Sequence, residues 1–190
     1  MSAAPITIHL MRHGAPVRPG LLLGRTDDDV TPTGVAACVD QAARLAVTSI
    51  VTSDLIRARQ CAAAIATARA LPTHVDPRWR EMDFGEWDSL APAVIDPTAL
   101  ARFWQDPDGC PPPAGERWST LVARVATALA TLDDAALVVT HGGAMRAAVA
   151  AACGLDARQT WAVDLPYAAV LSLHLWRGDA PAAQIVGLRA

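Results

Sequence analysis

The residues best suited to chemistry near the start of the chain are Arg12 and His13, which follow an apolar run at Ile6–Met11 and precede Gly14. The run is short and apolar, which predicts a buried strand. The pair should then lie at the carboxyl edge, where open α/β sheets bind ligands. A guanidinium fork matches phosphate oxygens, and an imidazole nitrogen can attack phosphorus. The pair indicates phosphoryl chemistry, although an Arg-His-Gly string alone is common and a histidine at a strand end often has a purely structural role.

A second histidine follows another predicted strand in the same way. The strand Ala136–Thr140 leads into His141, Gly142 and Gly143. Glycines let the backbone approach a ligand closely, and a protonated His141 could donate a hydrogen bond to a phosphoryl oxygen. We therefore predict that His141 and Gly142 contact the substrate. A strand-to-helix turn with one polar side chain is the simpler alternative.

A third cationic side chain, Arg57, comes soon after the predicted strand Ser49–Thr52. Ser53 or Asp54 could cap the following helix. The positive end of a helix favours an anion, and Arg57 in the first turn would add a charged fork there. Arg59 lies about 200° further around the helix, so we expect it at the surface.

An acidic stretch at Arg80–Asp88 supplies candidates for a general acid. Cleavage of a phosphate ester needs a proton for the departing oxygen. A glutamic acid beside an apolar wall and an anionic substrate keeps that proton near neutral pH. Glu81 is the first candidate, Asp83 the second and Glu86 the third. A solvated acidic loop is the plain alternative.

Strands and helices alternate along the chain, which predicts a mostly parallel sheet covered on both faces. The irregular part is Arg78–Glu116, which is rich in proline. The predicted strands are Ile6–Met11, Ser49–Thr52, Thr73–Val75, Ala136–Thr140, Ala169–Trp176 and Gln184–Leu188, and the predicted helices begin at Thr31-Pro32, Asp54, Thr98, Trp118 and Gly143 and end near Ala46, Ala70, Gln105, Leu132 and Ala152.

The composition suits one domain spanning residues 1–190, with 52% hydrophobic residues and a net charge of −3. This balance gives no reason to expect nucleic acid or an acidic membrane surface as a partner. The four cysteines are not spaced as metal ligands, and three lie in alanine-rich helical runs, which is typical of a reducing compartment. We find neither a secretory leader nor an apolar run of about 20 residues. These features predict a cytoplasmic protein.

Taken in order, the motifs resemble those of the histidine phosphatase superfamily, which also contains the cofactor-dependent phosphoglycerate mutases. The resemblance runs from Ile6 to about Val149. Its motifs are Leu10–Gly14, Ser53–Gln60, Glu81–Trp87 and Thr140–Gly143.

The resemblance implies a three-layer α/β/α sandwich and a two-step mechanism. His13 would attack phosphorus and become a phosphohistidine, while Arg12, Arg57 and His141 hold the phosphoryl oxygens. Glu81 would protonate the leaving alcohol and then assist a water molecule. Phosphoryl transfer asks mainly for positioning and charge stabilisation, which these side chains supply, so no metal or other cofactor is predicted. The crowded positive charge should also keep His13 neutral.

The loop Gly20–Asp27 resembles that of alpha-ribazole-phosphate phosphatases, which act late in cobalamin assembly. This implies Arg25 and Thr26 as substrate contacts and alpha-ribazole 5'-phosphate as one candidate substrate. Two departures leave the substrate open. Trp87–Ser89 stands where many relatives have Trp-Glu-Gly, and Ala15–Pro16 replaces a frequent polar pair.

The leading hypothesis is a phosphomonoesterase that acts on a small phosphorylated metabolite. The segment between the third and fourth motifs is short and proline-rich, whereas mutases usually carry a longer insertion there. A phosphoglycerate mutase, a protein-phosphohistidine phosphatase and a non-catalytic binding module are the alternatives. The sequence leaves open whether the protein is a monomer or a homodimer.

Overall fold

The computed structural model describes residues 4–178 and 182–190, and its centre is a mixed sheet. The six strands have the order β3-β2-β4-β1-β5-β6. β1, β2, β3 and β4 are parallel, as predicted, whereas β5 is antiparallel to β1 and β6 is antiparallel to β5. The strands are β1 (Ile6–Arg12), β2 (Ser49–Thr52), β3 (Thr73–Val75), β4 (Ala136–Thr140), β5 (Val170–Trp176) and β6 (Ala182–Arg189).

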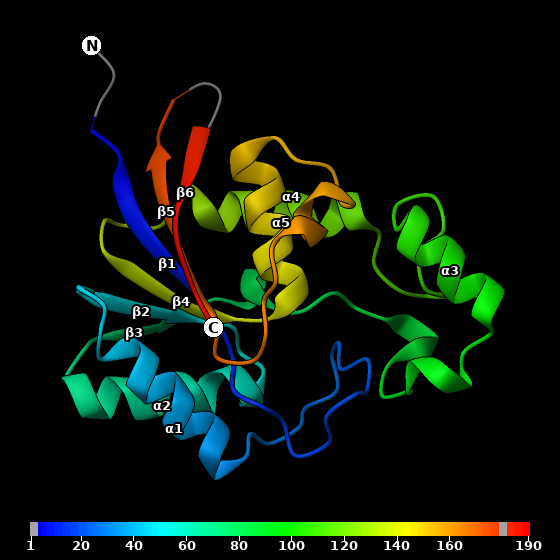
Figure 1. Ribbon diagram of the computed structural model, residues 1–190, viewed down its shortest axis with the longest axis horizontal. Coiled ribbons are helices and arrows are strands. Elements are labelled where there is room, and N and C mark those ends of the chain that lie inside the picture. The colour runs from blue at the N-terminus through cyan, green and yellow to red at the C-terminus, as the bar shows by residue number, and fades with distance from the viewer. Residues whose placement is uncertain (1–3, 179–181) are drawn as a thin grey trace.

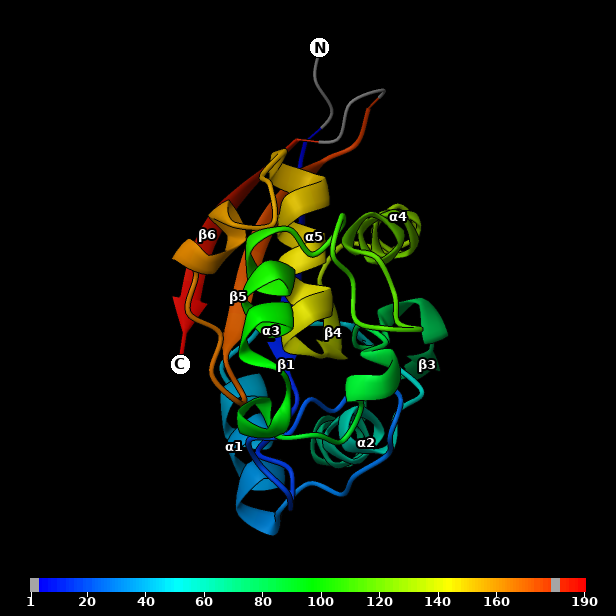
Figure 2. The same ribbon diagram turned by 90° about the vertical axis from the view of Figure 1, so that its right-hand side faces the viewer.

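Helices cover both faces of this sheet, which gives the predicted three layers. α1 and α2 lie on one face, and α4 and α5 lie on the other (Figure 1; Figure 2). No helix in the described part of the chain is long and apolar enough to cross a membrane. The helices are α1 (Pro32–Ala42), α2 (Ile56–Arg69), α3 (Pro97–Gln105), α4 (Trp118–Leu129) and α5 (Gly142–Cys153), and the short 3-10 turns are η1 (Pro77–Trp79), η2 (Gly85–Trp87), η3 (Pro92–Val94) and η4 (Gln159–Ala162).

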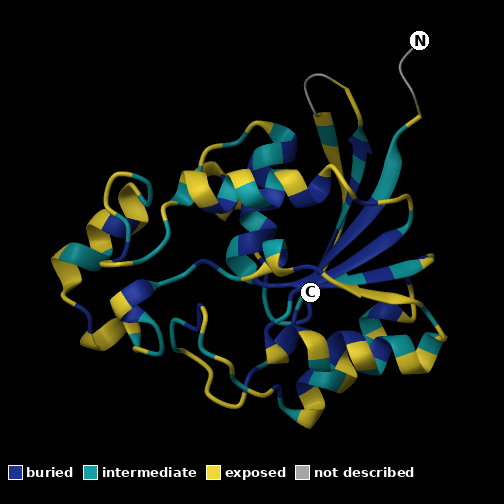
Figure 3. Ribbon diagram, turned by 180° about the vertical axis from the view of Figure 1, so that it is seen from behind, coloured by how far each residue is buried: buried dark blue, intermediate teal, exposed yellow. Residues whose placement is uncertain are grey.

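The alternation of side chains along β4 explains why both faces need a helical layer. Ala136 and Val138 join the core shared with α4 and α5, whereas Leu137 and Val139 join the core shared with α1 and α2. All five residues of the strand are buried. A central strand that is apolar on both faces is stable only between two layers, and the dark blue strands of Figure 3 lie in that position.

The pairing of β1 with β4 fixes where the two histidines leave the sheet. Arg12 pairs with Thr140 at the last position of the parallel register. The next backbone N–H, that of His13, donates to the Thr140 carbonyl at 2.8 Å. His13 and His141 therefore emerge side by side at the carboxyl edge, as predicted.

One predicted helix cap is wrong. α2 begins at Ile56, and its first free N–H donates to the carboxylate of Asp27 at 2.7 Å. Neither Ser53 nor Asp54 is its N-cap, because the hydroxyl of Ser53 meets His141 and the carboxylate of Asp54 pairs with Arg80. The Thr31-Pro32 cap of α1 is confirmed, since the Thr31 hydroxyl accepts from the Gly34 N–H.

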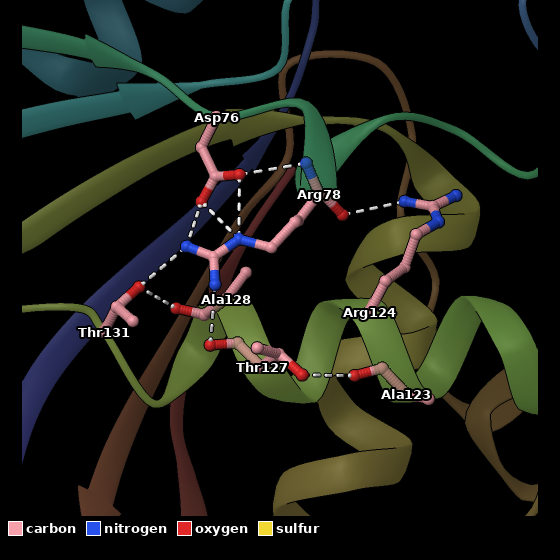
Figure 4. A network of polar contacts seen from close by, with 7 residues as sticks. All are labelled: Asp76, Arg78, Ala123, Arg124, Thr127, Ala128 and Thr131. Carbon is pink, nitrogen blue, oxygen red and sulfur yellow. Dashed lines mark hydrogen bonds and ion pairs between the residues drawn. The ribbon is translucent and has the colours of Figure 1, made fainter.

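The irregular segment between β3 and α4 is fixed to α4 by a charged network (Figure 4). The carboxylate of Asp76 accepts from the guanidinium of Arg78, with a shortest distance of 2.8 Å. Arg78 also donates to the Thr127 carbonyl and the Thr131 hydroxyl, and its own carbonyl accepts from Arg124 at 2.7 Å. This network holds η1 against α4 immediately before the segment that carries Glu81.

We predict that Gly14→Ala destabilises the fold. A Cβ on Gly14 would lie 2.2 Å from the carbonyl oxygen of Gly34, so the first loop would have to move away from α1. Overpacking of this kind costs about 1–3 kcal/mol of unfolding free energy, measurable by urea denaturation. Gly187→Ala is the control, because its Cβ would approach Ser172 no closer than 3.7 Å. Equal stabilities of the two variants would contradict this account.

Candidate active site

His13 is held in one tautomer by its neighbour along the chain. The ring is buried, and its Nδ1 lies 2.7 Å from the Gly14 carbonyl oxygen. A carbonyl oxygen can only accept, so Nδ1 carries the proton and Nε2 keeps a lone pair in the neutral ring. The ring centroid lies 5.1 Å from that of His141.

The surroundings of His13 keep it uncharged. Burial, and after it the nearby cations Arg57 and Arg12, lower its pKa to about 3, while the bond to Gly14 acts in the opposite direction. The predicted neutral state therefore agrees with the structure. Its main cause is removal from water, with the positive charge second.

His141 differs from the prediction in its protonation state. Burial, followed by the charge of Arg57, holds its pKa well below the ordinary value. The guanidinium Nε of Arg57 donates to its Nδ1 at 3.2 Å, so the neutral ring carries its proton on Nε2 and donates to the Ser53 hydroxyl at 2.7 Å. Both ring nitrogens thus have protein partners. The expectation of a protonated His141 is therefore corrected.

Arg57 lies beside His141, but its other donors face the protein backbone. The side chain is completely buried. Nη1 donates to the Thr26 carbonyl at 2.8 Å, and Nη2 donates to the carbonyls of Leu23 and Gly24 at 2.7 and 2.8 Å. Arg57 therefore fixes the first loop and brings positive charge to the histidines. Arg57 was predicted to bind the phosphate directly, whereas in this structure its terminal nitrogens donate to backbone carbonyls.

Arg12 and the start of α5 form a place for an anion. Nη1 of Arg12 donates to the Leu165 carbonyl at 2.7 Å, and the guanidinium lies 4.1 Å from the centroid of the Tyr167 ring. Its buried Nε has no hydrogen-bond partner among the described residues. A Cβ on Gly142 would lie 3.5 Å from that Nε, so the first turn of α5 adjoins it. Free N–H groups at a helix start and an unpaired guanidinium nitrogen both favour a bound oxyanion.

Glu81 lies at the same helix start. Its carboxylate accepts from the N–H of Gly143 at 3.1 Å and from that of Met82 at 2.8 Å. A side chain on Gly143 would displace the carboxylate, because its Cβ would lie 2.1 Å from Oε1. Arg124 holds the backbone of this segment by donating to the Glu81 carbonyl at 2.9 Å while it pairs with Glu116. The third and fourth motifs therefore meet at the N-terminus of α5.

The profile of the histidine phosphatase superfamily (branch 1) matches residues 8–186. The chain belongs to the histidine phosphatase superfamily. This membership makes it an enzyme of a phosphatase family, and the four motifs of that family are the segments that converge at the site. Among the residues described, no group of three or more His, Cys, Asp or Glu side chains could hold a metal ion.

Known members of the superfamily are similar over most of the chain. A glucosyl-3-phosphoglycerate phosphatase of Mycolicibacterium vanbaalenii is 32% identical over 70% of this chain and 66% of that protein. A protein of Erwinia tasmaniensis named as a probable phosphoglycerate mutase is 29% identical over 80% and 77% of the two chains.

Solved histidine phosphatase structures have the same fold. A mycobacterial glucosyl-3-phosphoglycerate phosphatase superposes with a TM-score of 0.85 at 25% identity, covering 95% of this chain and 97% of the other. An Escherichia coli structure named for alpha-ribazole-5'-P phosphatase gives 0.82 at 22% identity, covering 98% and 97%. At that identity the second likeness shows the fold alone.

Four of the six predicted substrate contacts, Arg57, His141, Arg25 and Thr26, are not among the residues that line the pocket beside Arg12 and His13. The hydroxyl and N–H of Thr26 donate to the carboxylate of Asp88 at 2.5 and 2.9 Å. Arg25 is exposed and pairs with Asp83 at 3.4 Å. Both residues therefore stabilise the loop and its surroundings. Glu86, the third candidate acid, is exposed and also lies outside the pocket lining.

The segment Trp87–Ser89, whose sequence differs from the family pattern described above, has a locally strained backbone. Ser89 has a φ of 67°, in the left-handed region that favours glycine. Its buried hydroxyl finds no partner within the described residues. Asp88, in contrast, accepts from the Gly24 N–H at 2.7 Å and so holds the first loop at the pocket.

The pocket has a volume of about 220 Å³, and several residues of its wall were not predicted. Arg146 follows Gly142 by four residues and so lies on the same face of α5, a spacing that could have identified it. Tyr167 and Leu165 come from the loop before β5, for which the sequence gives no comparable signal. The remaining unpredicted wall residues are Leu21, Leu22, Leu23, Met82, Phe103, Trp104, Pro107, Trp118, Leu121, Ala157 and Trp161.

We predict that stability falls in acid because of the buried histidines. The folded-state pKa of His13 is about 3 against an ordinary value of 6.5, so the unfolded chain binds the extra proton between these values. The free energy of unfolding is therefore highest above pH 6.5 and falls as the pH drops toward 3, by up to about 1.4 kcal/mol per pH unit for this group. Urea denaturation at pH 7.5 and 5.0 measures the slope.

Two variants test whether His13 causes this dependence of the free energy of unfolding on pH. His13→Asn should flatten it, whereas substitution of the exposed His74 in His74→Asn should leave it as in the wild type. A His13→Asn protein with an unchanged pH dependence would mean that other groups cause the acid instability.

Proposed function

We propose that this histidine phosphatase is a metal-independent phosphomonoesterase that forms a phosphohistidine on His13. The observation that carries the proposal is the tautomer of His13. A buried, neutral ring presents the Nε2 lone pair, next to an anion site formed by Arg12 and the start of α5. A nucleophile must be unprotonated at working pH, and this environment favours that state.

In the first step, Nε2 of His13 attacks phosphorus in line while the bond from phosphorus to the ester oxygen breaks. The new P–N bond places positive charge on the ring, which the Gly14 carbonyl at Nδ1–H stabilises. Arg12 and the N–H groups of α5 stabilise the phosphoryl oxygens. Protonated Glu81 delivers its proton to the departing alkoxide, which leaves as an alcohol.

In the second step, a water molecule attacks the phosphohistidine. Glu81, now a carboxylate, accepts the proton from this water while the P–N bond breaks. Inorganic phosphate leaves and His13 returns to its neutral form. Contact of His141 with a phosphoryl oxygen requires its Nε2–H to exchange Ser53 for the substrate, and we propose this exchange on binding.

The cavity of about 220 Å³ favours a small phosphorylated metabolite, since ligand pockets commonly measure about 300–1,000 Å³. Alpha-ribazole 5'-phosphate is one candidate, supported by the loop resemblance. Phosphoglycerate mutation is the second candidate function, favoured by the Erwinia tasmaniensis relative. A bisphosphoglycerate primer separates the two, because a mutase needs it and returns an isomer instead of free phosphate.

The proposed function predicts a covalent intermediate on His13. Rapid quenching of the enzyme with a ³²P-labelled monoester in the presence of a chelator should trap an acid-labile, base-stable phosphoprotein. His13→Ala should abolish the label and lower kcat by about 10³-fold or more, while phosphate binding partly survives. Turnover that His13→Ala leaves unchanged would refute the nucleophile, and turnover lost to the chelator would refute metal independence.

We also predict that Glu81→Gln slows cleavage according to the leaving group. General acid catalysis contributes about 10²–10⁴-fold, so kcat for an alkyl phosphate should fall by that order. The loss should be much smaller for p-nitrophenyl phosphate, whose departing oxygen needs no proton. Glu86→Gln, in the same segment but exposed, is the control and should retain wild-type rates. A uniform loss for both substrates would indicate a different role for Glu81.

A further inference from the structure

A row of aromatic rings leads from the buried core to the mouth of the pocket. The ring centroid of Phe103 lies 6.3 Å from that of Phe84 and 4.7 Å from that of Trp104. Trp104 in turn meets Trp161 at 5.3 Å with an interplanar angle of 89°. The inner end of the row is structural, because Phe103 is only 2% exposed and is the one buried residue of α3.

The outer end of the row, formed by Trp104 and Trp161, is not buried in the core. Trp104 is 40% exposed and Trp161 is 54% exposed, and both line the main pocket. They come from segments far apart in the chain, α3 and η4, and α3 stands away from the sheet (Figure 1). Large exposed apolar side chains gathered at a concave site are typical of ligand recognition.

Trp161 has a fixed orientation in spite of its exposure. The guanidinium carbon of Arg146 lies 3.9 Å from the centroid of its ring. Arg146 also donates to the carbonyls of Thr160 and Val163 at 2.6 and 2.9 Å, which ties η4 to α5. The indole is therefore held from one side by a cation while more than half of its surface stays open. A rigid aromatic surface of this kind binds a ring with little loss of side-chain freedom.

Much of the remaining pocket wall is apolar. Its members include Leu21, Leu22, Trp118 and Leu121. The charged groups of the pocket wall are Arg12, Glu81 and Arg146 among the residues described; the first two belong to the phosphoryl site, and the third is stacked on Trp161. The alcohol part of the substrate therefore meets mainly apolar and aromatic surface.

We propose that Trp104 and Trp161 form an aromatic corner that selects phosphate esters whose alcohol carries a planar aromatic ring. This inference rests on the proposed phosphatase function and names its substrate class. A ring that stacks on one indole meets the other nearly edge to face, and both arrangements are favourable. Alpha-ribazole phosphate, which carries a benzimidazole, belongs to this class. Phosphoglycerates do not belong to it.

The test compares three primary alkyl phosphates with equivalent leaving groups: 2-phenylethyl phosphate, 2-cyclohexylethyl phosphate and glycerol 3-phosphate. The cyclohexyl ester matches the phenyl ester in size but is not planar. Wild-type kcat/KM should be highest for the phenyl ester, about fivefold above the cyclohexyl ester. Equal values for these two esters would overturn the proposal, because the pocket would then recognise only apolar bulk.

Variants of the two tryptophans test whether these side chains cause the preference for the phenyl ester. Trp104→Ala and Trp161→Ala should each raise KM for the phenyl ester about tenfold, with kcat and the glycerol phosphate kinetics nearly unchanged. Trp161→Phe should retain most of the preference. Val94→Ala, which changes a residue 70% exposed and outside the pocket lining, is the control. Equal losses on all three substrates would indicate a purely structural role and overturn the proposal.

Failure of the proposed phosphatase function can be distinguished from failure of the aromatic corner. If the wild type hydrolyses none of the esters, the phosphatase proposal fails. Calorimetric binding of the same three esters then tests whether the aromatic corner prefers a planar ring. Tighter binding of the phenyl ester, weakened in Trp161→Ala, supports the corner. Equal affinities for the phenyl and cyclohexyl esters overturn it.

Discussion

The parallel register of β1 and β4 is the constraint on which the site depends. Because Arg12 pairs with Thr140, the residues that follow the two strands leave the sheet at the same level. His13 is fixed there by its N–H to the Thr140 carbonyl, and His141 becomes the residue before the first turn of α5. A shift of one residue would turn the side chains of one strand to the opposite face. The geometry of the site therefore depends on this register.

Removal from water determines the chemistry of the two imidazoles. Burial is the larger cause of the lowered pKa values of His13 and His141, and the positive charges of Arg57 and Arg12 add to its effect. The guanidinium groups of Arg12 and Arg57 are held in place by backbone carbonyl oxygens. These oxygens accept hydrogen bonds without carrying a full negative charge. The result is a neutral imidazole at His13 in a pocket that is electrostatically suited to an anion.

The segments outside the sheet supply the parts of the pocket wall that we propose to select the substrate. Glu81 reaches the site from an irregular segment that Arg124 and the Asp76–Arg78 pair hold against α4. Two of the three tryptophans that line the pocket, Trp104 and Trp161, come from α3 and η4. Loops on a rigid scaffold commonly carry such specificity.

The sequence by itself determined the fold class, the order of strands and helices, and the motif residues. Apolar runs of a given length and period mark buried strands and amphipathic helices, and the spacing of His13, Arg57, Glu81 and His141 relative to these elements is local information. Only the tertiary structure decided which groups those side chains contact. Arg57 turned to backbone carbonyls, His141 lost its expected proton, and Trp161 reached the pocket. These outcomes depend on burial and on contacts between residues distant in the chain, which no local pattern encodes.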